Sequence, residues 1–168
     1  MPDFFVAPCA EPGGNCQNAG VVCTSTTNSS QFGLCDDPPP NVFPAYIQHH
    51  TPDDWIAVVN NPDPKEVTFK AVDNCVQVVR PNGELDSRCD GFLWFDKNLI
   101  FLELKDRGTQ GWLTEGRQQL TVTIKNFVIN HGQDFHINVA YVCNKQRPSA
   151  IVNISEQVQM FKDETAVI

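Results

Sequence analysis

The chain has 168 residues, a length typical of a single domain. Its hydrophobic fraction of 41% is adequate for a packed core and argues against a fibrous or fully disordered protein, and its apolar runs are far too short to cross a bilayer. The net charge of −8 is unusual for a protein that handles nucleic acid, so the placement of the charges matters.

The acidic residues are concentrated at the front of the chain. Residues 1–64 contain seven Asp or Glu and no Lys or Arg, whereas residues 65–168 hold all twelve basic residues against thirteen acids. The rear part is therefore close to neutral and could approach a polyanion. Because the first residues lack the basic flank and long apolar stretch of a secretory signal, we expect a cytoplasmic protein without membrane contact.

Residues 1–45 are rich in Gly, Pro, Asn, Ser and Thr and show neither helical nor strand periodicity, which predicts an irregular acidic arm before a domain at 46–168. Three states are open for its cysteines: a structural Zn²⁺ site, thiols in a mobile arm, or disulfides. The arm could also bind a protein partner. The four cysteines in question are Cys9, Cys16, Cys23 and Cys35.

The segment after the arm begins with a helix signal. Thr51 can cap a helix, Pro52 suits the first helical position, and the two following acids favour the helix dipole; Asn60-Asn61-Pro62 would end this short helix. From Val67 to Val79 β-branched and aromatic residues predict one bent strand or two short ones. Pro81-Asn82-Gly83-Glu84 predicts a turn.

The apolar patterns that follow predict a central hairpin from Gly91–Phe95 and Leu99–Lys105, then a helix over 111–130 and a strand over 135–142. Ser155 could cap a last short helix that continues to Phe161. The order is α-β-β-β-α-β. It predicts an α/β fold with a mixed central sheet, in which the last strand returns parallel to its neighbour through the helix.

Three charged residues interrupt the apolar hairpin. Glu103 and Lys105 flank Leu104 on one strand and therefore share a face, and Asp90 opens the preceding strand. A loop at Lys97-Asn98 puts Asp90 opposite Lys105 and diagonal to Glu103, within reach of one cation. Charges in such apolar surroundings are costly unless they are paired or bind a ligand.

Two carboxylates on one rigid face suit Mg²⁺ or Mn²⁺, hard cations that take oxygen ligands and, for Mg²⁺ especially, keep several waters. Such a site can polarise a phosphate and generate a hydroxide nucleophile, while Lys105 could orient the water or neutralise developing charge. The alternative is that Asp90 stands alone and Glu103 and Lys105 form an ion pair on an edge strand.

Asp90, twelve intervening residues and Glu103-Leu104-Lys105, within this order of elements, resemble the PD-(D/E)XK (restriction-endonuclease-like) nuclease superfamily over about residues 51–145. The resemblance implies a divalent cation held by Asp90 and Glu103, with Lys105 assisting the attacking water. Many members carry a Gln or Glu on the following helix, and Gln118 and Gln119 rank before Glu115 for that role. Cys89 stands where the family often has Pro.

The leading hypothesis is therefore a metal-dependent nuclease that cleaves phosphodiester bonds, with DNA favoured over RNA. An alternative is a catalytically silent nuclease-like protein with a binding, immunity or regulatory role. A third is an interaction protein stapled by zinc in residues 1–45. In a nuclease, the acidic arm would either pack away from the active face or cover the cleft and restrain activity.

Overall fold

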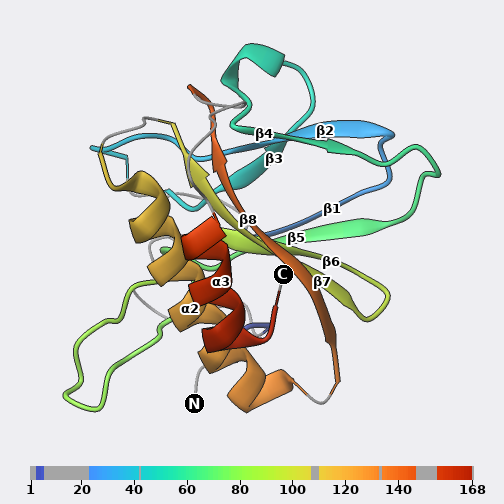
Figure 1. Ribbon diagram of the computed structural model, residues 1–168. Helices are drawn as coiled ribbons and strands as arrows, with labels where there is room; N and C mark the ends of the chain where they lie inside the picture. The colour runs from blue at the N-terminus through green and yellow to red at the C-terminus, as the bar shows by residue number, and fades with distance from the viewer. Residues whose placement is uncertain are drawn as a thin grey trace.

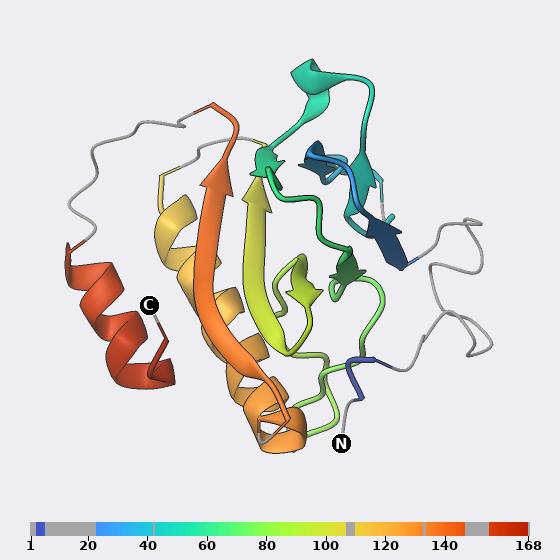
Figure 2. The same ribbon diagram turned by 90° about the vertical axis from the view of Figure 1, so that its right-hand side faces the viewer.

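The computed structural model describes residues 3–5, 23–41, 43–106, 110–132, 134–146 and 155–167. These residues form a mixed α/β fold in layers (Figures 1 and 2). Figure 2 shows the two α-helices on one face of a central sheet and a smaller sheet on the other face. In the part of the chain that is described, no helix is long and apolar enough to cross a membrane.

The central sheet has five strands in the order β1-β5-β6-β7-β8. The first four are antiparallel to their neighbours, whereas β8 runs parallel to β7 after the crossover helix α2. The prediction of a central hairpin followed by a helix and a parallel strand is therefore confirmed. The bounds are β1 Thr24–Thr27, β5 Val67–Ala71, β6 Gly91–Phe95, β7 Asn98–Lys105, α2 Trp112–His131 and β8 His136–Asn144.

The final helix, α3, spans Ser155–Thr165, so the helix expected near Ser155 forms and extends beyond the predicted end at Phe161. It lies against α2, and an ion pair of 3.1 Å joins Arg117 of α2 to Glu164 of α3. The predicted turn at residues 81–84 is also present, and Gly83 supplies its left-handed residue with φ of +84°.

The smaller sheet has the order β3-β2-β4, all antiparallel: β2 Gln31–Cys35, β3 Tyr46–Gln48 and β4 Ala57–Asn60. The prediction of a helix that starts at Thr51 was wrong. Only a single 3-10 turn, η2 Pro52–Asp54, forms there, without a side-chain cap from Thr51. Residues 57–60 instead alternate in exposure and pair with β2, an arrangement that suits the β-branched Val58 and Val59.

The prediction of irregular structure over 1–45 was also wrong where the chain is described. β1 forms one edge of the central sheet, and β2 is the middle strand of the smaller one. Near the start of the chain, Phe4 is fully buried, and Phe5 stacks on Phe135 with ring centroids 4.8 Å apart. Both phenylalanines also contact Phe127 of α2. Parts of the front segment therefore belong to the core.

Gly33 allows Trp55 to pack directly onto the middle strand of the smaller sheet. A Cβ atom at Gly33 would lie 2.0 Å from Cγ of Trp55, so a larger residue does not fit without rearrangement. The Trp55 indole N–H donates to Oε1 of Gln48 on β3 over 2.7 Å. This contact fixes the turn between β3 and β4 onto the sheet.

The front cysteines differ from one another. Cys23 is disulfide-bonded, and the Cys75 Sγ donates a hydrogen bond to its sulfur over 2.7 Å. Cys35 is a buried thiol that donates to the Asp54 carbonyl oxygen over 3.5 Å. Cys9 and Cys16 lie outside the described residues, so the zinc site stays a prediction, and the disulfide at Cys23 weighs against it.

Candidate functional site

The hairpin register differs from the predicted one. Phe95 pairs with Asn98, so the loop is Asp96-Lys97, and Asp96 adopts a left-handed backbone with φ of +54°. Asp tolerates this conformation better than most residues, which moves the loop one position toward the N-terminus. Each partner shifts by two residues, and an even shift keeps every side chain on its predicted face. Extended by one residue, the register places Asp90 directly opposite Glu103.

Asp90 and Glu103 are both buried beneath α2, with exposed fractions of 7% and 1%. The backbone N–H of Leu104 donates to Oδ2 of Asp90, which fixes that carboxylate against β7. The carboxylate of Glu103 also receives a backbone hydrogen bond from Asp90, which lowers its pKa, and no described side chain donates to its Oε2 atom. Burial raises the pKa of Glu103 to about 7, and burial together with the Glu103 charge raises the pKa of Asp90 well above its ordinary value.

Lys105 forms an ion pair with Oε1 of Glu103 and donates a hydrogen bond to Oε1 of Gln119 over 2.9 Å. Burial lowers the pKa of Lys105, but the charge and hydrogen bond of Glu103 outweigh it and raise that pKa above its usual value. The Lys105 ammonium group therefore balances the charge of Glu103 at Oε1, and the backbone of Asp90 adds a hydrogen bond that lowers the pKa of Glu103.

Of the three predicted helix residues, the structure brings Gln119 into the site. Its Nε2 donates to the Arg88 carbonyl oxygen over 2.9 Å, while its Oε1 accepts from Lys105. Gln118 is exposed to solvent. Glu115 is exposed as well, although its charge contributes to the raised pKa of Lys105.

Three charged residues near the site, Arg88, Asp73 and Asp36, were not among its predicted members. Arg88 donates to Oδ1 of Asp73 from Nη2 over 2.8 Å and from Nε over 3.1 Å, so Asp73 is held by an ion pair. Burial and the charge of Asp73 raise the pKa of Asp36 to about 6, and Asp36 in turn raises that of Asp90. Asp36, which follows β2 and belongs to the acidic segment 1–64, is therefore close enough to influence the charge of the site. A sequence signal was present: Asp36 directly follows the apolar run of a buried strand.

Across the described ranges, no three side chains of His, Cys, Asp or Glu converge so as to hold a metal ion. A cation at this site would have to rest on Asp90 and Glu103, with water completing its shell. Mg²⁺ commonly binds in this way, through one or two carboxylates and retained waters.

Comparison with known proteins returned no matching family model, curated protein or solved structure. The resemblance to the PD-(D/E)XK superfamily therefore depends on the Asp90, Glu103 and Lys105 motif and on the order of the elements around it.

Proposed function

We propose that the protein is a metal-dependent nuclease that hydrolyses phosphodiester bonds, with DNA favoured over RNA. The observation that carries the proposal is the arrangement of Asp90, Glu103 and Lys105. Two buried carboxylates face each other on neighbouring strands, and a lysine forms an ion pair with one of them. Burying two carboxylates is costly, and a ligand that needs them gives a reason for the cost.

The order of elements adds support. Strands β5, β6 and β7, then α2, then the parallel β8 follow the order β-β-β-α-β, which is the order expected for the later part of a restriction-endonuclease-like core. The first helix of that core has no counterpart in the described residues, where η2 and β4 occupy its place. The proposal therefore relies on the five later elements.

The residues fit a divalent cation. The carboxylate oxygens of Asp90 and Glu103 are hard ligands, and burial, the largest cause of their raised pKa values, makes a nearby cation favourable. When bound, a divalent cation supplies Lewis-acid activation of the phosphate and a more acidic water. Asp90 and Glu103 would hold the cation.

Lys105 and Gln119 would act on the substrate side. Lys105 carries a positive charge next to the carboxylates, suited to neutralise negative charge that develops on a phosphate oxygen. The amide of Gln119 holds the Lys105 ammonium group from the helix side. A group fixed from two sides is preorganised, so it costs little reorganisation when the charge develops.

The test incubates the full chain with supercoiled plasmid, single-stranded DNA and RNA, each with and without Mn²⁺. We expect cleavage that requires the cation and that Asp90→Ala or Glu103→Ala abolishes, together with loss of cation binding. Lys105→Ala should lose turnover and keep much of the cation affinity. Lys97→Ala, which removes an exposed lysine from the hairpin loop, is the matched control and should cleave normally.

The competing function is a catalytically silent nuclease-like binding protein. The Glu103–Lys105 ion pair favours it, because a lysine that satisfies a buried carboxylate can serve stability alone. Binding of Mn²⁺ without cleavage of any substrate would support that reading, and full activity in Glu103→Ala would refute the nuclease site.

A further inference from the structure

Two sulfur atoms meet in the core beside the edge strand β1. The Sγ atom of Cys75 lies 2.7 Å from the Sγ atom of Cys23, and both residues are buried, with exposed fractions of 5% and 2%. Cys23 belongs to a disulfide, whereas Cys75 carries a thiol. A thiol is thus in direct contact with one sulfur of a disulfide, and these are the two groups that react in thiol–disulfide exchange.

The bonded partner of Cys23 lies outside the described residues. Every other described cysteine is a thiol, namely Cys35, Cys75, Cys89 and Cys143. The cysteines outside the described ranges, Cys9 and Cys16, both precede Cys23 in the chain. The present disulfide therefore joins Cys23 to an earlier residue, whereas a bond to Cys75 would join residues 52 positions apart.

The backbone holds the two cysteines beside each other. The Ala71 N–H at the end of β5 donates to the Cys23 carbonyl oxygen over 2.9 Å, and the Cys75 N–H donates to the Val72 carbonyl oxygen over 3.1 Å. Ala71 and Val72 are themselves fully buried. The contact between the two sulfurs therefore follows from the pairing of β1 with β5 and from the turn after β5.

We propose that Cys23 and Cys75 form an internal thiol–disulfide exchange pair. The Cys75 thiolate attacks Sγ of Cys23, a bond between these two sulfurs forms, and the original S–S bond breaks. Its electron pair leaves with the sulfur of the former partner, which takes up a proton in place of the one that Cys75 has lost. One thiol and one disulfide are consumed and one of each is produced, so the step needs no oxidant.

The exchange would move a cross-link next to the candidate site. The Val72 N–H donates to the Asp90 carbonyl oxygen over 2.8 Å, and the Asp73 N–H donates to the Cys89 carbonyl oxygen over 3.1 Å. A bond between Cys23 and Cys75 would therefore tie β1 to the segment that holds the start of β6. It would also return the former partner of Cys23 to a thiol. The inference is independent of the proposed nuclease function.

The experiment follows the disulfides of the full chain without an oxidant. Protein purified without reductant is held at pH 6, 7 and 8 under nitrogen with a metal chelator, quenched with acid and alkylated at low pH with N-ethylmaleimide. Mass spectrometry of unreduced peptides should show a peptide pair joined through Cys23 and Cys75 that increases with time, while the number of thiols stays constant. Because the thiolate attacks, the rate should rise by roughly tenfold per pH unit while the thiol form dominates.

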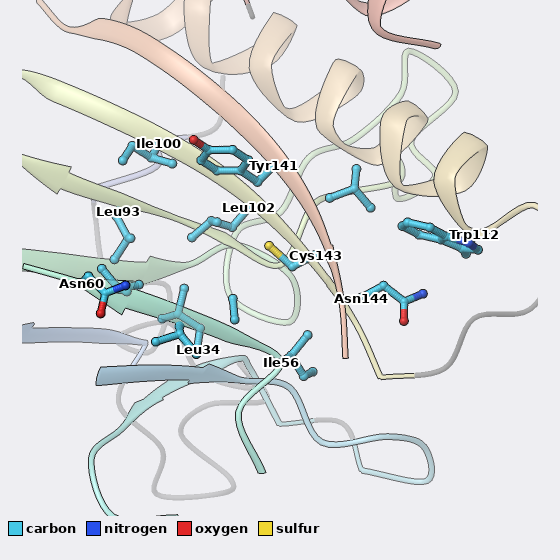
Figure 3. Close-up of a pocket in the computed structure, with 14 residues that line it drawn as sticks. Leu34, Ile56, Asn60, Leu93, Ile100, Leu102, Trp112, Tyr141, Cys143 and Asn144 are labelled. Carbon is cyan, nitrogen blue, oxygen red and sulfur yellow. The ribbon is translucent and has the colours of Figure 1, made fainter. Parts of the chain in front are cut away.

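Two variants separate this exchange from other thiol chemistry. Cys75→Ser removes the attacking sulfur, so Cys23 should keep its present partner at every pH. Cys143→Ser is the control, because Cys143 is a thiol that lines a cavity of about 590 Å³ between the two sheets (Figure 3). It should exchange like the natural chain. Thermal melting checks each fold, and Cys75→Ala replaces Cys75→Ser if the buried hydroxyl prevents folding.

Three results would overturn the exchange pair. The first is a natural chain that shows no peptide pair joined through Cys23 and Cys75 at any pH. The second is a Cys23 disulfide that changes partner equally fast in Cys75→Ser. The third is a bond between Cys23 and Cys75 that appears only as the number of thiols falls, since this would be oxidation. Each readout is a peptide map, so the result does not depend on whether the protein cleaves nucleic acid.

Discussion

Gln119 accepts a hydrogen bond from Lys105 through Oε1 and donates one to the Arg88 carbonyl oxygen through Nε2, each over 2.9 Å. One amide thus joins α2 to β7 and to the segment that precedes β6. Because both ends of the amide are held, its orientation is fixed, and the oxygen is kept toward the lysine. The position of Lys105 depends on this bridge as much as on its own strand.

Gln119→Ala should therefore lower cleavage by roughly 10- to 100-fold, the range seen when an outer partner of a catalytic group is removed. The loss should fall on kcat more than on KM, because Lys105 would act on charge that develops in the transition state. Steady-state kinetics on a fluorescent oligonucleotide would measure it. The neighbouring Gln118 is exposed, so Gln118→Ala is the matched control, and an equal loss in both variants would contradict the bridge.

The buried carboxylates give the stability a defined pH dependence. Burial raises the pKa of Glu103 from 4.5 to about 7 in the folded state and raises that of Asp90 as well. The folded protein therefore binds protons more tightly than the unfolded chain, and stability is lost as the pH rises from the unfolded pKa through the folded one. Without divalent cations, thermal unfolding should occur at a lower temperature near pH 8 than near pH 6.

Glu103→Gln, which stays neutral, should remove part of this slope and raise the melting temperature near pH 8. Glu84→Gln changes an exposed carboxylate and should leave the slope intact. Adding Mn²⁺ near pH 8 should restore stability to the natural chain and not to Glu103→Gln. A natural chain that becomes steadily more stable between pH 6 and pH 8, with Glu103→Gln unchanged, would show that these carboxyl groups are not buried as described.

Gly33 offers a test of the smaller sheet. In Gly33→Ala the new methyl group would overlap the Trp55 ring, and overpacking of this kind costs about 1–3 kcal/mol. Chemical denaturation would measure the loss. In a Trp55→Ala background the same substitution should cost much less, because the ring that it meets is gone. An equal cost in both backgrounds would mean that Gly33 is needed for another reason.

The disulfide at Cys23 predicts sensitivity to reductant. Loss of a native disulfide typically costs about 2–5 kcal/mol of stability, so dithiothreitol should lower the melting temperature of the natural chain. Cys23→Ser should melt at the same lowered temperature, and dithiothreitol should not lower it further. Cys143→Ser, at a half-buried thiol, is the control. A melting temperature that does not change with reductant would contradict a stabilising disulfide at Cys23.

The part of the fold that could be predicted has strong local patterns. The apolar hairpin, the helix α2 and the alternating β8 each carry their periodicity within a single segment. The strands β1 to β4 have three to five residues each, too few for a pattern to appear. Their pairing partners are distant in sequence, and tertiary pairing overrode the helix signal at Thr51.

The same division applies to the site. Asp90, Glu103 and Lys105 could be placed on one face of the sheet because side chains alternate along a strand. The predicted partners were wrong by two residues, and a shift by an even number of residues keeps each side chain on its face. The choice between Gln118 and Gln119 required the rotation of α2 about its axis, which packing against the sheet decides. The place of Asp36 beside the site depends on which segments meet in space, and no local pattern contains that information.

The strand β1, at one edge of the central sheet, precedes the other described strands in the chain. Thr24 to Thr27 pair with Val67 to Lys70, so during synthesis β1 leaves the ribosome well before its partner exists. An unpaired strand is a site for mistaken pairing with other chains. Residues 24–30 are all Thr, Ser or Asn, so they lack the apolar alternation that would have predicted a strand. The same polar side chains would keep β1 hydrated before it pairs. Because β1 joins the sheet through residues forty or more positions away, whereas β6 and β7 form a local hairpin, we expect β1 to pair late in folding.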